Sequence, residues 1–287
     1  MQDPRIFDMD HADLSWCPGC GDFQILEALK KALAELDIAP NQVVVASGIG
    51  QAAKLPHYMK CHCFNGLHGR ALSCATAMKM ANPDMLVLAV GGDGDMYGEG
   101  GNHFLHTVRR NPNVKNFVHN NGVYGLTKGQ ASPTSFVGMK TPTSPEGVFS
   151  EPINPVALAI CLGASFVARA FSGDVEQTKE IMKQAILHKG YALVDIFQPC
   201  VSFNKINTFK WYKEHTYYLD GSHDPEDREA ALRKAFEAEK MPLGLLYRRE
   251  RPVFEEHLAP YKEQRLPLYR RRRDMRDLEA FIRQQYA

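Results

Sequence analysis

The sequence predicts an α/β protein built on a doubly wound, mostly parallel sheet. Short apolar runs, typical of strands buried on both faces, alternate with segments of helical periodicity along the first 220 residues. Several runs end in glycine or polar residues, as parallel strands do at the carboxyl edge of an open sheet. The composition changes from residue 221, so we expect an α/β domain over 1–220 and a C-terminal helical and basic extension over 221–287, which we expect to touch another subunit.

Five short segments are the expected strands. Each is short and is bounded by Gly, Pro, Asn or Asp. The expected strands are 42–46, 85–90, 115–120, 164–171 and 191–197. The expected helices are 23–37, capped by Asp22, then 71–81, 99–110, a short one opened by Asn154 and Pro155, one to His188 capped by Asp174, and one after Asp224. Because helices alternate with strands, the crossovers predict parallel pairing.

Two segments are expected to lack regular structure. Residues 54–65 are irregular in pattern and rich in His and Cys. Residues 131–153 are rich in Ser, Thr, Pro and Gly. Long loops of this kind in compact domains usually have a function or are covered, and we expect this one to be buried against a partner.

Composition and charge exclude several classes of protein. The 287 residues carry a net charge of +1, which gives no overall signal for nucleic-acid binding. No apolar run reaches transmembrane length and no signal-peptide pattern begins the chain, so we expect a cytoplasmic protein without membrane contact. Residues 248–287 hold 11 Lys and Arg against 7 Asp and Glu, which is typical of a solvated face or of an interface between subunits.

Polar residues follow two neighbouring expected strands. Gly92, Asp93 and Gly94 end the 85–90 strand, and Asn121 ends the 115–120 strand, 28 residues after Asp93. The Asp93 carboxylate, the Asn121 amide oxygen and the Val123 carbonyl are hard oxygen ligands that suit Mg²⁺ and leave places for phosphate oxygens. Either fragment alone is also typical of a tight turn. Their combination across strand, helix and strand favours a diphosphate and magnesium site.

Five motifs in order resemble one family. They are WCPGCGDF from Trp16, SGIG from Ser47, GLHGRA from Gly66, GDG from Gly92 with Asn-Asn later, and YGLTKGQ from Tyr124. Over about residues 10–260 the chain resembles the thiamine-diphosphate-binding β subunit of a 2-oxoacid:ferredoxin oxidoreductase. The resemblance implies a sheet of thiamine-diphosphate-binding type.

The resemblance also implies an activity and its partners. The expected reaction is coenzyme A-dependent oxidative decarboxylation of a 2-oxoacid to acyl-CoA and CO₂, or the reverse carboxylation, with electrons passed through a [4Fe-4S] cluster to ferredoxin. The thiamine pyrimidine would be bound by a partner α subunit, without which this chain is inactive, and an (αβ)₂ assembly is expected. We take 2-oxoglutarate as the best guess for the substrate, with pyruvate or branched-chain oxoacids next.

Site residues follow from matching the motifs residue by residue. Lys128 is the expected contact for the substrate carboxylate, and His68 and Arg70 are expected to place charge near the diphosphate or the reaction centre. Asp95 is expected to orient the GDG turn. The expected cofactor-binding residues are Gly48, Ile49, Gly50, His68, Gly92, Asp93, Gly94, Asp95, Asn121, Val123, Tyr124, Gly125 and Leu126.

Seven cysteines in this chain are more typical of metal binding and packing than of disulfides. Cys17-x-x-Cys20 alone fits a zinc site, a redox pair or two Fe–S ligands. The resemblance implies cluster ligands at Cys17, Cys20 and Cys200, but the position after SGIG, where the family has a cysteine, is Gln51. We expect Cys63, or alternatively Cys61, to replace it. The remaining two, Cys74 and Cys161, are expected to pack in the core.

Two other classes of function stay open from the sequence. A thiamine-diphosphate-dependent decarboxylase or synthase without Fe–S needs no cysteine cluster and would be free of iron. A zinc-stabilised, non-catalytic interaction module would bind zinc and no thiamine diphosphate. The metal content of the purified protein therefore separates the three hypotheses.

Overall fold

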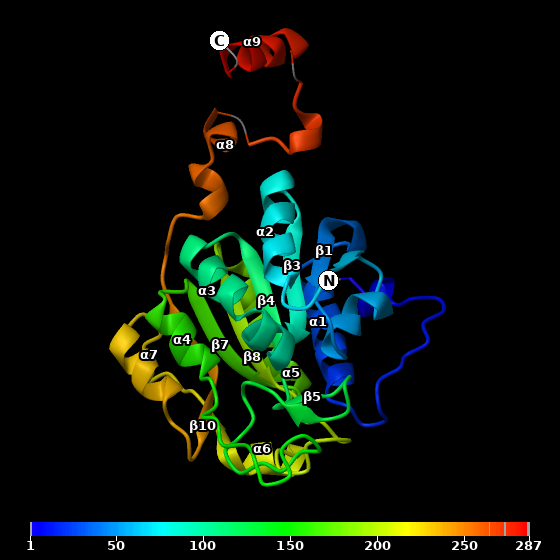
Figure 1. Cartoon of the computed structure of the whole chain (residues 1–287), viewed down its shortest axis with the longest axis vertical. Coiled ribbons are helices and arrows are strands. Elements are labelled where there is room, and N and C mark those ends of the chain that lie inside the picture. Colours follow the sequence, from blue (N-terminus) through cyan, green and yellow to red (C-terminus); the bar gives the residue numbers. More distant parts are fainter. Residues whose placement is uncertain (1, 264, 273, 286–287) are drawn as a thin grey trace.

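The computed structural model describes residues 2–263, 265–272 and 274–285 of the chain. Its centre is an eight-stranded sheet in the order β2-β1-β3-β4-β8-β7-β10-β9 (Figure 1). The strands are β1 (Val43–Ser47), β2 (His62–Asn65), β3 (Leu86–Gly92), β4 (Val114–Asn120), β7 (Phe166–Phe171), β8 (Ala192–Phe197), β9 (Thr216–Tyr218) and β10 (Met241–Arg248). Every neighbouring pair is parallel except β10 with β7. The predicted mostly parallel α/β sheet is therefore confirmed.

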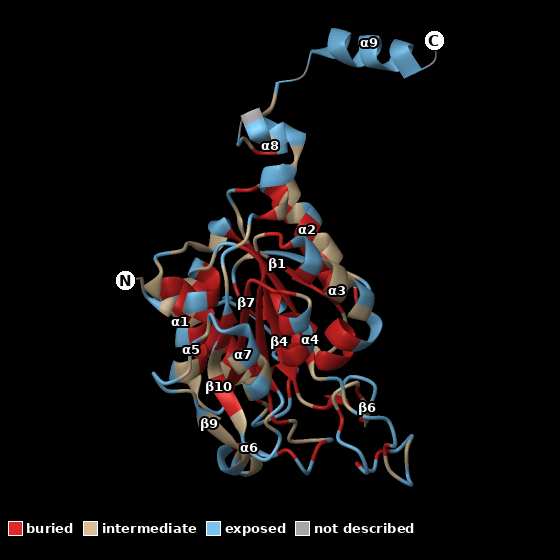
Figure 2. Ribbon diagram, turned by 90° about the vertical axis from the view of Figure 1, so that its left-hand side faces the viewer, coloured by how far each residue is buried: buried red, intermediate tan, exposed pale blue. Residues whose placement is uncertain are grey.

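Helices cover both faces of this sheet. On one face, α1 (Asp22–Glu35) and α5 (Val175–Leu187) pack together against the sheet through residues such as Leu29 and Met182. On the other face the core includes residues of four helices, namely α2 (Ala71–Ala81), α3 (Gly101–Arg110), α4 (Pro155–Cys161) and α7 (Arg228–Ala235). Figure 2 shows the buried strands between these two layers. The central strands β4, β7 and β8 are buried along their whole length, including the charged residues Lys115, Arg169 and Asp195.

Side-chain caps fix where several helices begin. Asn154 accepts a hydrogen bond from the Ala157 N–H at the start of α4, and Asp174 accepts one from Gln177 at the start of α5, as predicted. The cap predicted at Asp22 is wrong. Asp22 is the first residue of α1 and makes no cap; its carboxylate lies 2.6 Å from Nδ1 of His119, and both side chains are buried.

Three strands of the sheet, β2, β9 and β10, were not predicted. The segment expected to be irregular contains a 3₁₀ turn (Ala52–Tyr58) and then β2, which forms an edge of the sheet beside β1. The apolar segment after α7 is β10, which joins the same sheet antiparallel to β7. Because β9 and β10 lie on either side of the expected boundary at residues 220 and 221, the sheet continues across that boundary as far as Arg248. Helix α7 is also shorter than the pattern after Asp224 suggested.

The remaining elements lie outside the sheet. Helix α6 (Phe209–His215) packs with Phe171 and Phe197, at the ends of β7 and β8. Helices α8 (Ala259–Glu263) and α9 (Met275–Gln285) follow β10, and α9 has no buried residue (Figure 2). Cys74 packs partly against the core as expected, but Cys161 is exposed at the last turn of α4, so the packing role expected for it is wrong. None of the described helices is long and apolar enough to cross a membrane.

Candidate functional site

The carboxyl ends of β1, β3 and β4 bring the predicted motifs together. In the ladders, Ser47 pairs with Val90 and Gly92 pairs with His119, so the segments that follow these strands lie side by side. They surround a cavity of about 380 Å³. Its lining contains twelve of the predicted residues, namely Ile49, Gly50, His68, Gly92, Asp93, Gly94, Asp95, Asn121, Val123, Tyr124, Gly125 and Leu126. The adjacency predicted from the strand pattern is present in the structure.

Asp93 supplies a buried carboxylate to this cavity. Its side chain is 1% exposed, and Oδ2 accepts hydrogen bonds from Ser132 Oγ at 2.5 Å and Thr134 Oγ1 at 2.6 Å. Burial raises the pKa of the Asp93 carboxyl, and the two hydroxyls oppose that rise. No described Lys, Arg or His forms an ion pair with it. A buried carboxylate without a cationic partner is suited to a metal ion, which would supply the missing positive charge.

The turn after β4 contains two more oxygen atoms of the kind that bind Mg²⁺, namely the amide oxygen of Asn121 and the carbonyl oxygen of Val123. Asn121 Oδ1 accepts a hydrogen bond from its neighbour Val123 N–H at 3.0 Å, and Asn121 Nδ2 donates to Gln198 Oε1 at 2.9 Å. The amide is thereby oriented with its oxygen toward the turn. Gly122 between them has φ +68, which a residue with a side chain adopts at a cost. The Asp93 carboxylate and the Asn121 amide fit the hard-oxygen donor set of Mg²⁺.

Position 94 must be a glycine because the ring of Tyr124 lies against its backbone. A Cβ there would collide with the ring of Tyr124, whose hydroxyl donates to the Gly94 carbonyl at 3.3 Å. The turn after β3 continues as a π-type turn (Gly94–Glu99) before α3, where the sequence suggested a helix from residue 99. Such turns inside helices are frequent at functional sites.

Asp95 holds three segments in place. Its Oδ1 accepts hydrogen bonds from the Ile49 N–H at 3.0 Å and from the Gly69 N–H at 2.8 Å. It therefore joins the turns after β1 and before α2 to the turn after β3, a wider role than orienting the GDG turn alone. A Cβ on Gly48 would collide with this carboxylate, so Gly48 does not line the cavity and instead leaves room for Asp95.

The three residues predicted to be catalytic lie in different places. His68 lines the cavity, whereas Arg70 and Lys128 do not. Arg70 is exposed and precedes α2 as its N-cap residue. Lys128 is exposed in the turn between β5 (Val123–Tyr124) and β6 (Gln130–Ala131) and has a φ of +81, which is rare for a residue other than glycine. Arg70 and Lys128 are thus exposed residues outside the wall of the cavity.

Several residues of the site were missed from the sequence. Gln51, Ala52, Glu99, Thr127, Gln130 and Ala131 line the cavity, and Ser132 and Thr134 bind Asp93. The available signal was the run of hydroxyl residues directly after YGLTKGQ. The loop 131–153 is expected to be buried against a partner, but its first residues belong to the site.

The cysteines of the CPGC turn lie against the segment that follows β8. Ser202 Oγ donates to Cys17 Sγ at 3.0 Å, and Gln198 Nε2 donates to Cys20 Sγ at 3.4 Å. The charge of Cys200 is among the causes that raise the pKa of Cys20, although burial is the largest cause. Three predicted ligands are therefore neighbours. Among the described residues, however, no three His, Cys, Asp or Glu side chains are arranged to hold a single metal ion.

Cys61 and Cys63 lie elsewhere. Cys63 is exposed on β2, and β1, β3 and β4 separate that strand from β8, a distance of roughly 19 Å at the usual strand spacing. Cys61 packs partly against the core, where burial raises the pKa of its thiol to about 12. Among the described residues, no hydrogen bond joins Cys61 or Cys63 to Cys17, Cys20 or Cys200. The expected fourth ligand at Cys63 is not brought to the CPGC turn.

Gln51 is the residue that lies beside that turn. Its carbonyl accepts a hydrogen bond from Trp16 Nε1 at 2.9 Å, next in sequence to Cys17. The side-chain Oε1 of Gln51 is buried and has no hydrogen-bond partner among the described residues. Because Gln51 also lines the large cavity, it connects the cavity to the cysteine turn.

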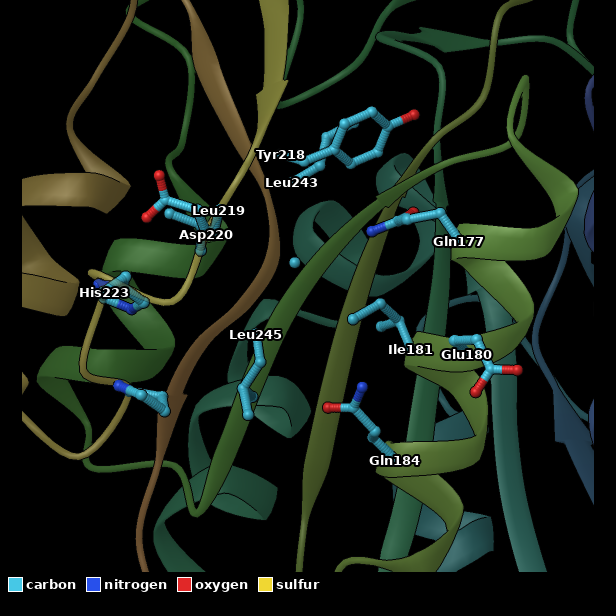
Figure 3. Close-up of a pocket in the computed structure, with 12 residues that line it drawn as sticks. Gln177, Glu180, Ile181, Gln184, Tyr218, Leu219, Asp220, His223, Leu243 and Leu245 are labelled. Atoms are coloured by element: carbon cyan, nitrogen blue, oxygen red, sulfur yellow. The ribbon is translucent and has the colours of Figure 1, made fainter.

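A second hollow lies between α5 and the strands β9 and β10 (Figure 3). Gln177, Ile181 and Gln184 project into it from α5, opposite Leu245 of β10. Two of its ionisable groups are engaged elsewhere: Tyr218 donates to Asp174, and Asp220 accepts from Ser222. This hollow lacks the glycine turns and the buried carboxylate of the first cavity.

Comparison with known proteins agrees with this site. Residues 37–196 match the family model for the thiamine pyrophosphate enzyme, C-terminal TPP binding domain, and residues 200–263 match the model for the C-terminal part of the pyruvate ferredoxin oxidoreductase beta subunit. The β subunit of 2-oxoacid:ferredoxin oxidoreductase 1 from Aeropyrum pernix is 46% identical over 88% of this chain and 83% of its own length. The chain belongs to the 2-oxoacid:ferredoxin oxidoreductase β subunits.

Two further relatives of this β subunit have 2-oxoglutarate in their names. The 2-oxoglutarate oxidoreductase subunit KorB of Mycobacterium tuberculosis is 45% identical over 67% of this chain and 52% of its own length. The solved 2-oxoglutarate:ferredoxin oxidoreductase from Magnetococcus marinus, with 2-oxoglutarate, coenzyme A and succinyl-CoA bound, is 39% identical. It matches with a TM-score of 0.89 over 92% of this chain and 90% of that one. The predicted family and the thiamine-diphosphate-binding fold are confirmed.

Proposed function

We propose that this β subunit, with an α subunit, carries out coenzyme A-dependent oxidative decarboxylation of 2-oxoglutarate to succinyl-CoA and CO₂, or the reverse. The observation that carries the proposal is that Gly92–Gly94 and Asn121–Val123 lie around one cavity. The cavity contains the buried carboxylate of Asp93, which has no cationic partner among the described residues. The choice of 2-oxoglutarate is supported by the relatives named for that acid. The oxidation sends electrons singly to ferredoxin.

The residues of the cavity have distinct tasks in this proposal. Asp93, Asn121 and the Val123 carbonyl would hold Mg²⁺ on the diphosphate, and the glycines beside Asp93 let the diphosphate approach the main chain. Thiamine diphosphate, when bound, supplies a nucleophilic carbon and an electron sink. Asp95 keeps the walls from β1 and β3 at a fixed separation. Ile49 and Leu126 give the wall of the cavity two apolar side chains.

Residues in or beside the cavity would bind the substrate. Lys128 is proposed to contact a substrate carboxylate, because a cation held with φ +81 is a backbone outlier of the kind that gathers at ligand sites. His68 in the cavity wall and Arg70 beside α2 are proposed to place positive charge near the diphosphate or the substrate. The pyrimidine side of the cofactor is left to the α subunit.

A [4Fe-4S] cluster at Cys17, Cys20 and Cys200 is the proposed electron acceptor. The neighbourhood of these three thiols supports it, since a cluster spans more space than a single ion. For the fourth position the buried, unpartnered oxygen of Gln51 is the better placed donor, and Cys63 or Cys61 is the alternative that requires movement of β2. Binding of iron would displace the thiol protons, whose loss burial opposes at Cys20.

The partners follow from the same proposal. The α subunit, ferredoxin, the 2-oxoacid and coenzyme A are the expected partners, in an (αβ)₂ assembly in the cytoplasm. The C-terminal extension is proposed to pack on another subunit. Helix α9 supports this, because Met275, Leu278, Phe281 and Ile282 form an exposed apolar stripe at helical spacing.

The proposal is tested by assaying the complex of this chain with its α subunit for reduction of ferredoxin. We expect reduction that needs both coenzyme A and a 2-oxoacid, with a higher kcat/KM for 2-oxoglutarate than for pyruvate or branched-chain oxoacids. A preference for pyruvate would overturn the substrate assignment. Release of CO₂ without any ferredoxin reduction would overturn the oxidoreductase assignment in favour of a decarboxylase.

A further inference from the structure

A buried arginine, Arg169, lines a cavity that Asn120 at the end of β4 also lines. Arg169 of β7 is 4% exposed, and its Nε and Nη1 have no hydrogen-bond partner among the described residues. The carboxylate of Asp195 on β8 approaches Nε only to 4.0 Å. A guanidinium normally makes several of its five possible hydrogen bonds, and leaving donors unpaired in the interior is costly.

Asp195 lies at ion-pair distance from Arg169 but makes no hydrogen bond with its Nε or Nη1. Tyr97 Oη donates to Asp195 Oδ1 at 2.8 Å, and Asn120 Nδ2 donates to both oxygens, at 3.2 and 3.3 Å. The Arg169 guanidinium instead stacks over the ring of Phe197, 5.2 Å from the ring centroid. Its Nε and Nη1 are left without an acceptor among the described residues.

That arginine lines a cavity that contains a second unpaired donor. The cavity measures about 190 Å³ and is bounded by β7, β8, the loop after β6 and the segment after α7. Asn207, which is 3% exposed, also lines it, and its Nδ2 has no hydrogen-bond partner among the described residues. Two buried donors from distant parts of the chain thus meet at one cavity.

The rest of the lining limits the class of ligand. Phe197 and Tyr212 form apolar walls, and Phe236, which is 66% exposed, lies at the rim. The acidic groups that line the cavity are Asp195 and Glu237; Glu237 is already bonded to Lys234 and Tyr217. A planar carboxylate matches the fork of a guanidinium, and the volume suits a body of a few carbon atoms.

We propose that Arg169 and Asn207 form a second ligand site, distinct from the cofactor cavity, that binds the carboxylate of a small organic acid. The ligand carboxylate accepts hydrogen bonds from Arg169 Nε and Nη1 and from Asn207 Nδ2, and its carbon chain lies against Phe197 and Tyr212. The position of the site at the carboxyl ends of β7 and β8 makes it open at the same edge of the sheet as the cofactor cavity.

The test uses glutarate, which lacks a keto group, and the purified complex of this chain with its α subunit. Two variants at the exposed rim, Phe236→Glu and Phe236→Gln, have nearly the same shape and differ by one charge. Calorimetric titration should show glutarate binding that Phe236→Glu weakens roughly tenfold or more relative to Phe236→Gln, since the added charge opposes the anion. Arg169→Lys keeps the charge but loses the fork, and should weaken binding roughly tenfold to hundredfold.

The two Phe236 variants keep the test decisive even where Arg169→Lys fails to fold. If glutarate does not bind the complex, the site takes no free organic acid and the proposal is overturned, whatever effect Phe236→Glu has on association with the α subunit. If glutarate binds equally well to Phe236→Glu and Phe236→Gln, it binds elsewhere in the complex and the proposal is overturned.

Discussion

Thr134 Oγ1 donates a hydrogen bond of 2.6 Å to Asp93 Oδ2, across 41 positions of sequence. The same hydroxyl lies 2.9 Å from Asn120 Oδ1, so one side chain of the loop after β6 joins the ends of β3 and β4. The loop therefore belongs to the site and positions the carboxylate that we propose as a ligand of Mg²⁺.

Asp93→Ala should abolish retention of thiamine diphosphate and Mg²⁺ while the fold survives. Asp93 is the carboxylate of the proposed metal site, and its loss removes the charge that holds the cation. Cofactor content after gel filtration measures the effect. Glu99→Ala, which removes a carboxylate from the same cavity, is the matched control and should keep the cofactor. Full thiamine diphosphate in Asp93→Ala would show that the metal site is elsewhere.

Gly48→Ala and Asp95→Ala should each disrupt the contact between the turn after β1 and the Asp95 carboxylate. The first places a methyl group where the Asp95 carboxylate lies, and the second removes both of its backbone hydrogen bonds. Each should cost about 2–4 kcal/mol of unfolding free energy and weaken cofactor binding. Gly101→Ala, at a glycine whose added Cβ would meet nothing, serves as the control in denaturant unfolding. Unchanged stability in Gly48→Ala would rule out the role of Asp95 as a bridge.

Lys128→Gly should weaken substrate binding without lowering the stability of the fold. Glycine adopts a φ of +81 freely, so this change should leave the stability equal or raise it by up to about 1 kcal/mol. Removal of the cation should raise the KM for the oxoacid roughly tenfold or more and leave the KM for coenzyme A nearly constant. Lys140→Ala, at an exposed lysine of the following loop, is the control. An unchanged oxoacid KM would place the carboxylate contact at another residue.

Gln51→Cys should increase the iron retained by the complex and the stability of its visible spectrum toward oxygen. A thiolate at the place of the Gln51 amide would complete four sulfur ligands with Cys17, Cys20 and Cys200. Cys63→Ser tests the alternative, with Cys74→Ser as the control for loss of a thiol outside the proposed ligand set. Iron loss in Cys63→Ser, with no gain in Gln51→Cys, would assign the fourth ligand to Cys63, as the sequence alone predicts.

The sequence predicted the sheet and the cofactor cavity because both depend on local patterns. Strands such as β3 show as apolar runs, and the turns after β3 and β4 show in the sequence as glycines beside Asp93 and Asn121. β10 was missed because Met241–Arg248 is an antiparallel strand whose pairing with β7 depends on a distant part of the chain. β2 was missed because it is short and exposed at the edge of the sheet, where an apolar run is not needed.

The less predictable part of the site depends on long-range contacts. The contact of Asp22 with His119 joins residues 97 positions apart, and an aspartate before a helix normally indicates a cap. The hydroxyls on Asp93 come from a loop whose path no periodicity describes. The separation of Cys63 from Cys200 depends on the strand order, since β1, β3 and β4 all lie between β2 and β8.

The most direct test of the assigned chemistry is the content of thiamine diphosphate, iron, acid-labile sulfide and zinc in the complex with the α subunit, purified without oxygen. We predict thiamine diphosphate together with iron and sulfide in equal amounts and a broad visible absorption that bleaches when a 2-oxoacid and coenzyme A are added. Thiamine diphosphate without iron, or zinc without thiamine diphosphate, would contradict this account.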